Sequence, residues 1–154
     1  MEYMIVKWLH VLFSTLLFGT GIGSAFYLLV TTLTRDVRAV SIVSSVVVIA
    51  DWLFTATTAV LQPLTGFWMM HIAGLPWSAG WIKWSIVLYV IAIACWLPVV
   101  GLQMKLRQVA QQAWRSNSPL PPQYWRYFRM WVALGVPAFF AFLAIFYLMV
   151  VKPA

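Results

Sequence analysis

The sequence has very little charge and almost no acid. Of its 154 residues only 8% are charged, and Asp and Glu together number 3, whereas 64% are hydrophobic. That balance excludes soluble globular and disordered chains, which carry far more polar side chains. A nucleic-acid partner is not expected either, because the basic residues behind the net charge of +7 border apolar segments.

Cysteine is equally scarce. Cys95 is the only one, so no internal disulfide can form. The sequence also has no CxxCH motif for covalent haem and no CxxC redox pair. A disulfide-stapled scaffold and a covalently attached haem are therefore excluded.

Long apolar runs are what the sequence does have. Four of them exceed the ~20 residues that cross a ~30 Å hydrocarbon core as a helix, and they lie at about 4–31, 40–70, 79–103 and 127–151. The predicted fold class is all-α, a transmembrane four-helix bundle that forms a single domain over 1–154. Its one sizeable loop is predicted at about 104–126.

Lys and Arg are concentrated in two of the connections, 32–39 and 104–126. The positive-inside rule places these loops in the cytoplasm, so both termini and the 71–79 loop are expected outside. The expected location is a bacterial inner membrane, crossed several times, with both termini periplasmic. Tryptophans near the predicted helix ends are typical of an aromatic belt; they are Trp8, Trp68, Trp77, Trp81, Trp125 and Trp131.

Asp51 lies in the middle of the second apolar run, with no Lys or Arg within a helical turn. A carboxylate at that depth costs ~2.5–3.5 kcal/mol on insertion scales, so it is expected to face the bundle interior or a water-filled cavity. Two interpretations stay open. The functional one is proton handling, or pairing with a cation such as Arg129 or Lys83. The structural one is a protonated carboxyl hydrogen-bonded to Thr or Gln side chains.

Polar side chains recur at helical spacing on the first two segments. On the first segment they are Lys7, His10, Ser14, Gly21 and Ser24; on the second they are Ser44, Asp51, Thr55, Thr58, Gln62, Thr65 and Met69. Such spacing puts each set on one helical face. The two helices are therefore expected to turn these faces toward a shared interior.

Small residues and prolines interrupt the apolar segments. Gly19 and Gly23 form a GxxxG pair, which indicates close helix packing or clearance for a flat cofactor. Pro63 and Pro137 lie inside the second and fourth segments. Each is expected to free a backbone carbonyl one turn earlier.

The two histidines are the candidate cofactor and metal ligands, and both are predicted in the outer half. Imidazole ligates haem iron and copper, and haem fits between the facing helices of a bundle. His10 is the candidate axial ligand of a b-type haem, with His71 or Met69 as the second ligand. Lys7 and Lys83 are placed to pair with the propionates. The alternative is that His10 is a hydrogen-bonded packing residue.

Copper is the alternative cofactor. Met69, Met70 and His71, with Met1 and Met4 on the same predicted side, offer thioether and imidazole donors that suit Cu(I).

Several stretches resemble an uncharacterised bacterial family of predicted integral membrane proteins. They are LFGTGIGSAFY, ADWLFTATTAVLQPLTGFWM, LYVIAIACWLPVVGLQMKLR and GVPAFFAFLAIFYLMVVKP. The likeness covers nearly the whole chain and implies a helical membrane protein.

A more distant resemblance concerns the start of the first segment. Lys7-Trp8-Leu9-His10 is similar to the K-x-x-H opening of HemJ-type protoporphyrinogen oxidases, small helical membrane proteins associated with b-type haem. That resemblance implies His10 as a haem ligand. Gly80-Trp81-Ile82-Lys83 is similar to their G-W-x-x-x-K motif, although the Lys comes earlier and a neighbouring histidine is absent. The same grouping includes CopD-like domains tied to copper.

The leading expectation is an inner-membrane protein that binds b-type haem and transfers electrons or oxidises a small hydrophobic substrate. Its polar interior would relay protons or meet a quinone or another membrane redox partner; that interior comprises Asp51, Gln62, Thr55, Thr58 and Ser14. One alternative is a cofactor-free accessory or assembly subunit, in a homo-oligomer or a larger membrane complex. The other is copper or small-solute handling in the membrane.

Overall fold

The structure, a computed structural model, describes residues 1–153 and is built from α-helices. The helices are α1 (Glu2–Thr34), α2 (Val37–Ala50), α3 (Ala56–Ala73), α4 (Gly80–Arg115) and α5 (Pro122–Val151), with a π-helical turn η1 (Asp51–Thr55) between α2 and α3. Because α2, η1 and α3 follow one another without a break, the chain has 4 helical rods long and apolar enough to cross a membrane. The predicted all-α transmembrane bundle is confirmed, and no strand occurs within residues 1–153.

The helices are longer than the apolar runs that predict them. α4 continues to Arg115 and α5 begins at Pro122, so most of the predicted 104–126 loop is helical and the connection is only 116–121. Proline is well suited to the first turn of α5, where its missing N–H would have no helical partner. At 1.5 Å per residue α4 is ~54 Å long, which exceeds the ~30 Å hydrocarbon core.

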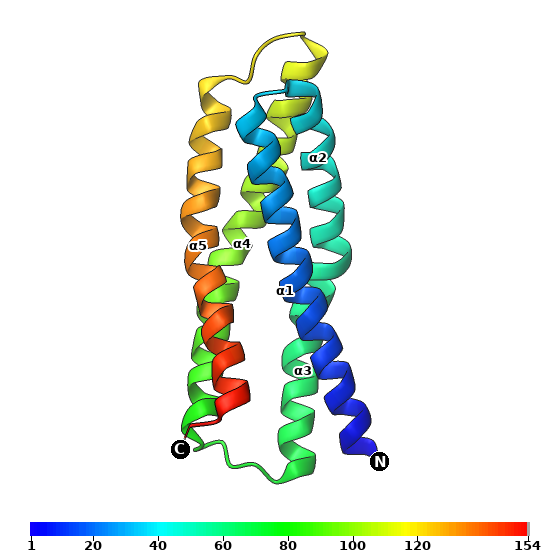
Figure 1. The fold of residues 1–154 in the computed structure, drawn as a ribbon, viewed down its shortest axis with the longest axis vertical. Helices are drawn as coiled ribbons and strands as arrows, with labels where there is room; N and C mark the ends of the chain where they lie inside the picture. Colours follow the sequence, from blue (N-terminus) through cyan, green and yellow to red (C-terminus); the bar gives the residue numbers. More distant parts are fainter. Residues whose placement is uncertain (154) are drawn as a thin grey trace.

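The two ends of the bundle differ in content. Both chain termini and the α3–α4 connection lie at one end, here called the terminal end (Figure 1). The α1–α2 and α4–α5 connections lie at the other, here called the basic end because of its cationic residues, among them Arg35, Arg38, Arg115 and Arg126. This arrangement agrees with the pairing of loops that the charge pattern predicts.

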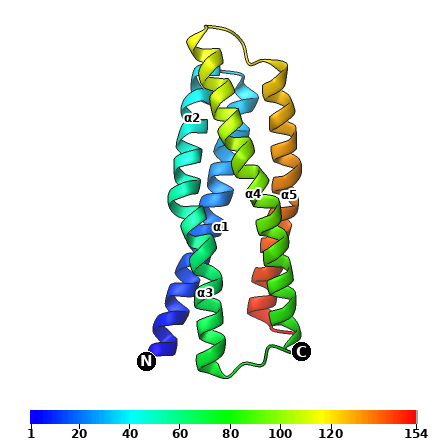
Figure 2. The same ribbon diagram turned by 180° about the vertical axis from the view of Figure 1, so that it is seen from behind.

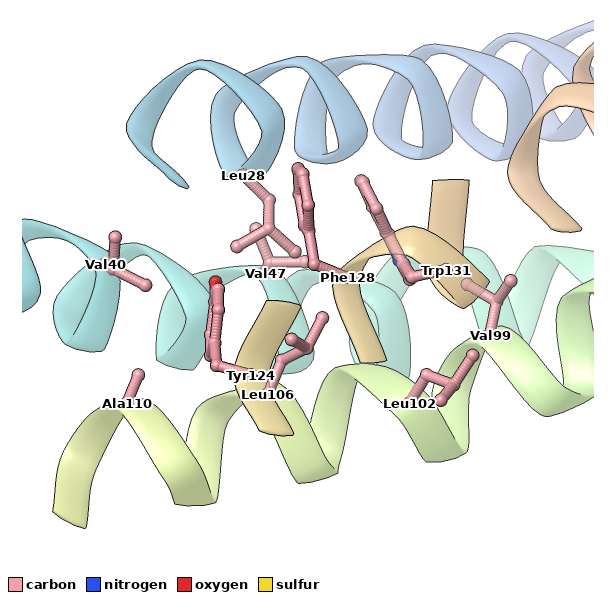
Figure 3. Close-up of a cluster of buried hydrophobic side chains, with 10 residues drawn as sticks. All are labelled: Leu28, Val40, Val47, Val99, Leu102, Leu106, Ala110, Tyr124, Phe128 and Trp131. Atoms are coloured by element: carbon pink, nitrogen blue, oxygen red, sulfur yellow. The ribbon is translucent and has the colours of Figure 1, made fainter. Parts of the chain in front are cut away.

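The packed core occupies the half of the bundle near the basic end. Side chains from α1, α2, α4 and α5 interlock there (Figure 3); they are Leu28, Val40, Val47, Val99, Leu102, Leu106, Ala110, Tyr124, Phe128 and Trp131. The Tyr124 hydroxyl and the Thr32 hydroxyl share a 2.9 Å hydrogen bond within it. Both residues are fully buried, so each of these two hydroxyl groups has its partner inside the core.

Toward the terminal end the bundle divides into two helix pairs. There α1 packs on α3, and α4 packs on α5, and the ribbons of the two pairs stand apart in both views (Figures 1 and 2). Aromatic side chains bridge the division: the ring centroids of Phe18 on α1 and Phe139 on α5 are 6.0 Å apart. The half near the basic end therefore holds the packed core, and the half near the terminal end consists of two helix pairs joined by side chains.

Pro63 explains a second bridge between the pairs. Proline lacks an N–H, so the carbonyl of Ala59 four residues earlier loses its helical donor. The Tyr89 hydroxyl of α4 donates to that carbonyl instead. The freed carbonyl that the sequence predicts is confirmed, and its new partner comes from the opposite helix pair.

Tyr89→Phe should lower the free energy of unfolding by ~1–3 kcal/mol, because the Ala59 carbonyl would lose the hydrogen bond that it accepts from the Tyr89 hydroxyl. The same change in a Pro63→Ala background should cost clearly less, since alanine at that position would restore the helical N–H. Unfolding in mixed detergent micelles, followed by circular dichroism, measures this double-mutant cycle. Equal losses in the two backgrounds would contradict the link between Pro63 and Tyr89.

Candidate binding site between the helix pairs

Asp51 lies where the half of the bundle with the packed core meets the half with the two helix pairs. It is the first residue of η1, and its side chain is only 3% exposed. The Thr55 hydroxyl donates to Asp51 Oδ1 at 3.1 Å, and the Ser24 hydroxyl of α1 donates to the same oxygen at 3.5 Å. The carboxyl is thus held by hydroxyl groups from its own rod and from the neighbouring helix.

The π-helical turn that carries Asp51 is a local departure from α-helix. The N–H of Ala56 donates to the carbonyl of Asp51, five residues earlier, which is the π-helical pattern. The hydroxyls of Thr57 and Thr58 donate to the carbonyls of Leu53 and Phe54 and help to satisfy this turn. Isolated π-turns inside α-helices are rare and frequently mark functional sites.

A cavity of about 470 Å³ opens beside Asp51, between α1, η1, α4 and α5. Its volume falls within the ~300–1,000 Å³ range of small-molecule sites. The wall is mostly apolar, with aromatic rings toward the terminal end. Its polar lining residues are Ser24, Asp51, Thr55, Gln103, Trp96 and Trp131.

Some buried polar side-chain atoms near this cavity have no hydrogen-bond partner. Within residues 1–153, the buried side-chain nitrogen and oxygen atoms without a hydrogen-bond partner are Gln62 Oε1, Trp96 Nε1, Gln103 Oε1 and Trp131 Nε1. All of these residues except Gln62 line the cavity. A buried polar atom without a partner costs ~1–3 kcal/mol, and most such groups in proteins are satisfied. These atoms themselves have almost no accessible surface, so they do not form the exposed wall of the cavity.

The cavity is open to the membrane side of the bundle. Ile22, Phe26 and Phe140 belong to its wall and are 38%, 58% and 61% exposed. Gly21 also lines it, and a Cβ added at Gly21 would meet no atom of the described chain within 4 Å. Part of the cavity wall is therefore exposed along α1 and α5.

The GxxxG pair of α1 does not pack closely against another helix of this chain. A Cβ at Gly19 or Gly23 would likewise meet no described atom within 4 Å. The prediction of close helix packing at these residues is therefore wrong for contacts inside this chain. The small residues border open space along α1.

His10 lies away from this cavity and joins α1 to α3. Its Nδ1 is 2.9 Å from Thr65 Oγ1, and its Nε2 is 3.1 Å from Gln62 Nε2. Because the Thr65 hydroxyl donates to the Leu61 carbonyl, Nδ1 carries the proton and donates to Thr65. Nε2 then accepts from the Gln62 amide. The ring also fits against Gly66, where a Cβ would stand 3.2 Å from His10 Cε1.

The remaining predicted ligands do not gather around His10. His71, Lys7 and Lys83 are exposed, and Met69 is half-buried. No group of three or more His, Cys, Asp or Glu residues is placed to hold a metal in the part of the chain that the structure describes. Both His10 nitrogens are already bonded to α3, so this arrangement does not fit a haem iron. Haem ligation stays a prediction, and it requires Nε2 to leave Gln62.

The predicted polar interior is divided between the two sites. Asp51 and Thr55 meet at the cavity, whereas Gln62 bonds to His10. The Ser14 hydroxyl bonds to the Val11 carbonyl of its own helix, and the Thr58 hydroxyl bonds to backbone as described above. A continuous relay between Asp51 and Gln62 is not formed by these hydrogen bonds.

Sequence reasoning misses three cavity residues. The pattern of helix ends predicts Trp131 in the interfacial belt, but this side chain is only 6% exposed and lines the cavity. Gln103 falls at the predicted start of a loop, because Lys105 follows it closely. The available signal is an amide side chain at the end of an apolar run, just before a cluster of basic residues. Trp96 has no distinguishing pattern in the sequence.

Comparison with protein families agrees with this architecture. The family model described as "Predicted integral membrane protein (DUF2269)" matches residues 4–153. The chain belongs to this family. The family resemblance seen in the sequence is thereby confirmed, and the chain is an integral membrane protein. Similarity to HemJ-type and CopD-like proteins stays a prediction. No curated protein and no solved structure matches the chain.

His10→Ala should lower the free energy of unfolding by ~1–3 kcal/mol, because it removes both hydrogen bonds of the imidazole to α3. The loss should be the same for protein made in haem-replete and haem-depleted cells, as measured by unfolding in mixed micelles. Visible spectra of the oxidised and dithionite-reduced samples are the control. A Soret band that disappears with His10, together with a loss seen only in haem-replete protein, would contradict the structural role and favour haem ligation.

Proposed function

We propose that this protein binds a small lipid-soluble molecule with a polar head group, which enters from the bilayer between α1 and α5. The observation that carries the proposal is the cavity of about 470 Å³ beside Asp51, a buried carboxyl on a π-helical turn that lines this cavity. A polar head placed there would lie beside the Asp51 carboxyl. The apolar remainder would extend along the exposed wall toward lipid.

The surroundings of Asp51 favour this assignment over a role in helix packing alone. A carboxyl kept only for helix packing needs hydrogen-bond partners, and Thr55 and Ser24 already supply them. It does not need an adjoining cavity of about 470 Å³ or a rare π-turn. Both features are expected of a binding site.

The proposed ligand corresponds to the small hydrophobic substrate or quinone-type partner that the sequence predicts, and the cavity beside Asp51 is its proposed site. It does not depend on haem or copper at His10. The proposed setting is a bacterial inner membrane with the basic end in the cytoplasm and the termini outside. The Arg and Lys residues of the basic end support that orientation.

The test uses two leucine variants of the same helix. Gly21→Leu puts a side chain into the cavity, whereas Gly19→Leu adds the same side chain on an exposed surface of α1 that does not line it. The probe is a C12 alcohol with a diazirine in its chain, incorporated in phosphatidylcholine nanodiscs. Photolabelling of the wild type should be saturable, should be displaced by excess 1-dodecanol, and should fall on segments 17–29 and 131–142.

Gly21→Leu should reduce saturable labelling at least tenfold, and Gly19→Leu should leave it unchanged. Circular dichroism and gel filtration check that both variants fold like the wild type. Labelling that does not saturate, or that both variants retain equally, would overturn the proposed function.

A further inference from the structure

We infer that the proposed ligand is an amphiphile about as long as one leaflet of the bilayer, and that it comes from the leaflet at the basic end. Its polar head lies at the basic end of the cavity beside Asp51, and its apolar chain points toward the bilayer midplane. This inference rests on the proposed function and names the class of molecule and its orientation. Compounds without a chain, and lipids of the leaflet at the terminal end, do not belong to that class.

Cationic residues on α4 and α5 mark the two surfaces of the hydrocarbon core. On α4 no charged residue occurs between Lys83 and Lys105. Along α5 none occurs between Arg129 and Lys152, the residue that caps the helix. At 1.5 Å per residue these intervals are ~33 Å and ~35 Å long, close to the ~30 Å of the core. All of these side chains are exposed. The core boundary at the basic end therefore lies at the level of Lys105 and Arg129.

The cavity occupies the half of the core next to that boundary. On α4 its lining residues run from Ile93 to Gln103. On α5 they run from Trp131 to Phe142. Gln103 and Trp131 directly adjoin the boundary level in sequence, whereas Ile93 and Phe142 lie near the middle of the two uncharged intervals. The lined stretches are ~15 Å and ~17 Å long, about the thickness of one leaflet.

Polar side chains mark the basic end of this cavity. On the rod formed by α2, η1 and α3, on α4 and on α5, the lining residue nearest the basic end is Asp51, Gln103 and Trp131, respectively. On α1 the lining continues past Ser24 to Leu29. The lining residues at the opposite end are apolar on every rod; they are Leu17, Ala59, Ile93 and Phe142. The cavity therefore has a polar end at the boundary and an apolar end near the midplane.

This gradient matches the order of groups within one leaflet. A lipid of the basic-end leaflet holds its head at the boundary and its chain toward the midplane, so both parts meet walls of their own polarity. A lipid of the other leaflet would have to carry its polar head through hydrocarbon to reach Asp51, which is unfavourable. The exposed wall residues Phe26 and Phe140 belong to the same stretch, so entry there needs no passage through the opposite leaflet.

The test uses two photoactivatable C12 alcohols that differ only in the position of the diazirine, which lies next to the hydroxyl or at the far end of the chain. Each is incorporated in phosphatidylcholine nanodiscs with the wild-type protein, and labelled residues are located by mass spectrometry. Saturable label from the head-proximal probe should fall mainly on 24–29 and 131–135. Label from the chain-end probe should fall mainly on 17–21 and 139–142. The ratio of label between the two ends of the cavity should thus invert between the probes.

A pair of leucine variants on α5 supplies a second arm. Ala138 lines the cavity toward the midplane, whereas Ala133 is exposed and does not line it. Ala138→Leu takes up space for the chain, so 1-dodecanol should displace the head-proximal probe about fivefold less well, because some of its methylene groups lose their contacts. The short chain of 1-hexanol stays near the boundary, so its displacement should be unchanged. Ala133→Leu should leave both competitors unchanged.

The outcomes separate this inference from the proposed function. Head-proximal label on 139–142, or the same labelled residues for both probes, would overturn the orientation and leave the proposed function standing. Equal weakening of 1-hexanol and 1-dodecanol by Ala138→Leu would overturn the place of the chain. The probe pair needs no variant, so it tests the orientation even if Ala138→Leu fails to fold. Absence of saturable labelling by either probe would instead overturn the proposed function.

Discussion

The burial of one carboxyl inside an apolar membrane rod is the constraint on which the rest of the structure depends. Asp51 cannot face lipid without a large cost, so its surroundings must supply polar partners. Thr55 and Ser24 supply hydroxyls, and the π-helical turn directs the carboxyl toward the space between helices. The same space is lined by Trp96 and Gln103 of α4 and by Trp131 of α5. Asp51 is therefore the one carboxyl in a mostly apolar cavity wall.

The helices pack differently in the two halves of the bundle. Near the basic end, a core that includes the matched Thr32–Tyr124 pair holds four helical rods together. Toward the terminal end the helices form two pairs, joined by aromatic rings and by the Tyr89–Ala59 bond. His10 stabilises one of these pairs. The half with the packed core borders Asp51 on one side, and the proposed ligand enters from the bilayer between α1 and α5.

Much of this architecture follows from the sequence. Apolar run lengths predict the helices, the loop charges predict which loops share an end, and Pro63 predicts a freed carbonyl. Asp51 stands out because a carboxyl in an apolar run is costly unless polar partners surround it. The cavity residues on α4 and α5 do not stand out. Tryptophan is common in membrane helices, and the rotation of a largely apolar helix leaves no periodic signal, so Trp96 and Trp131 emerge only from the packing. The apolar pattern also underestimates the length of α4, because basic residues in a helix that leaves the bilayer resemble a loop.

The most direct test of the central claim is the response of the two tryptophans that line the cavity, Trp96 and Trp131, to an added lipid alcohol. The chain has 10 tryptophans, and ¹⁵N–¹H spectra of the protein in nanodiscs report each indole N–H separately. Signals of Trp96 and Trp131 are assigned by single Phe substitutions. On addition of 1-dodecanol these two signals should shift, because both side chains line the cavity, while the other indoles change little. If both signals stay in place while the alcohol demonstrably partitions into the bilayer, the cavity beside Asp51 is not the binding site.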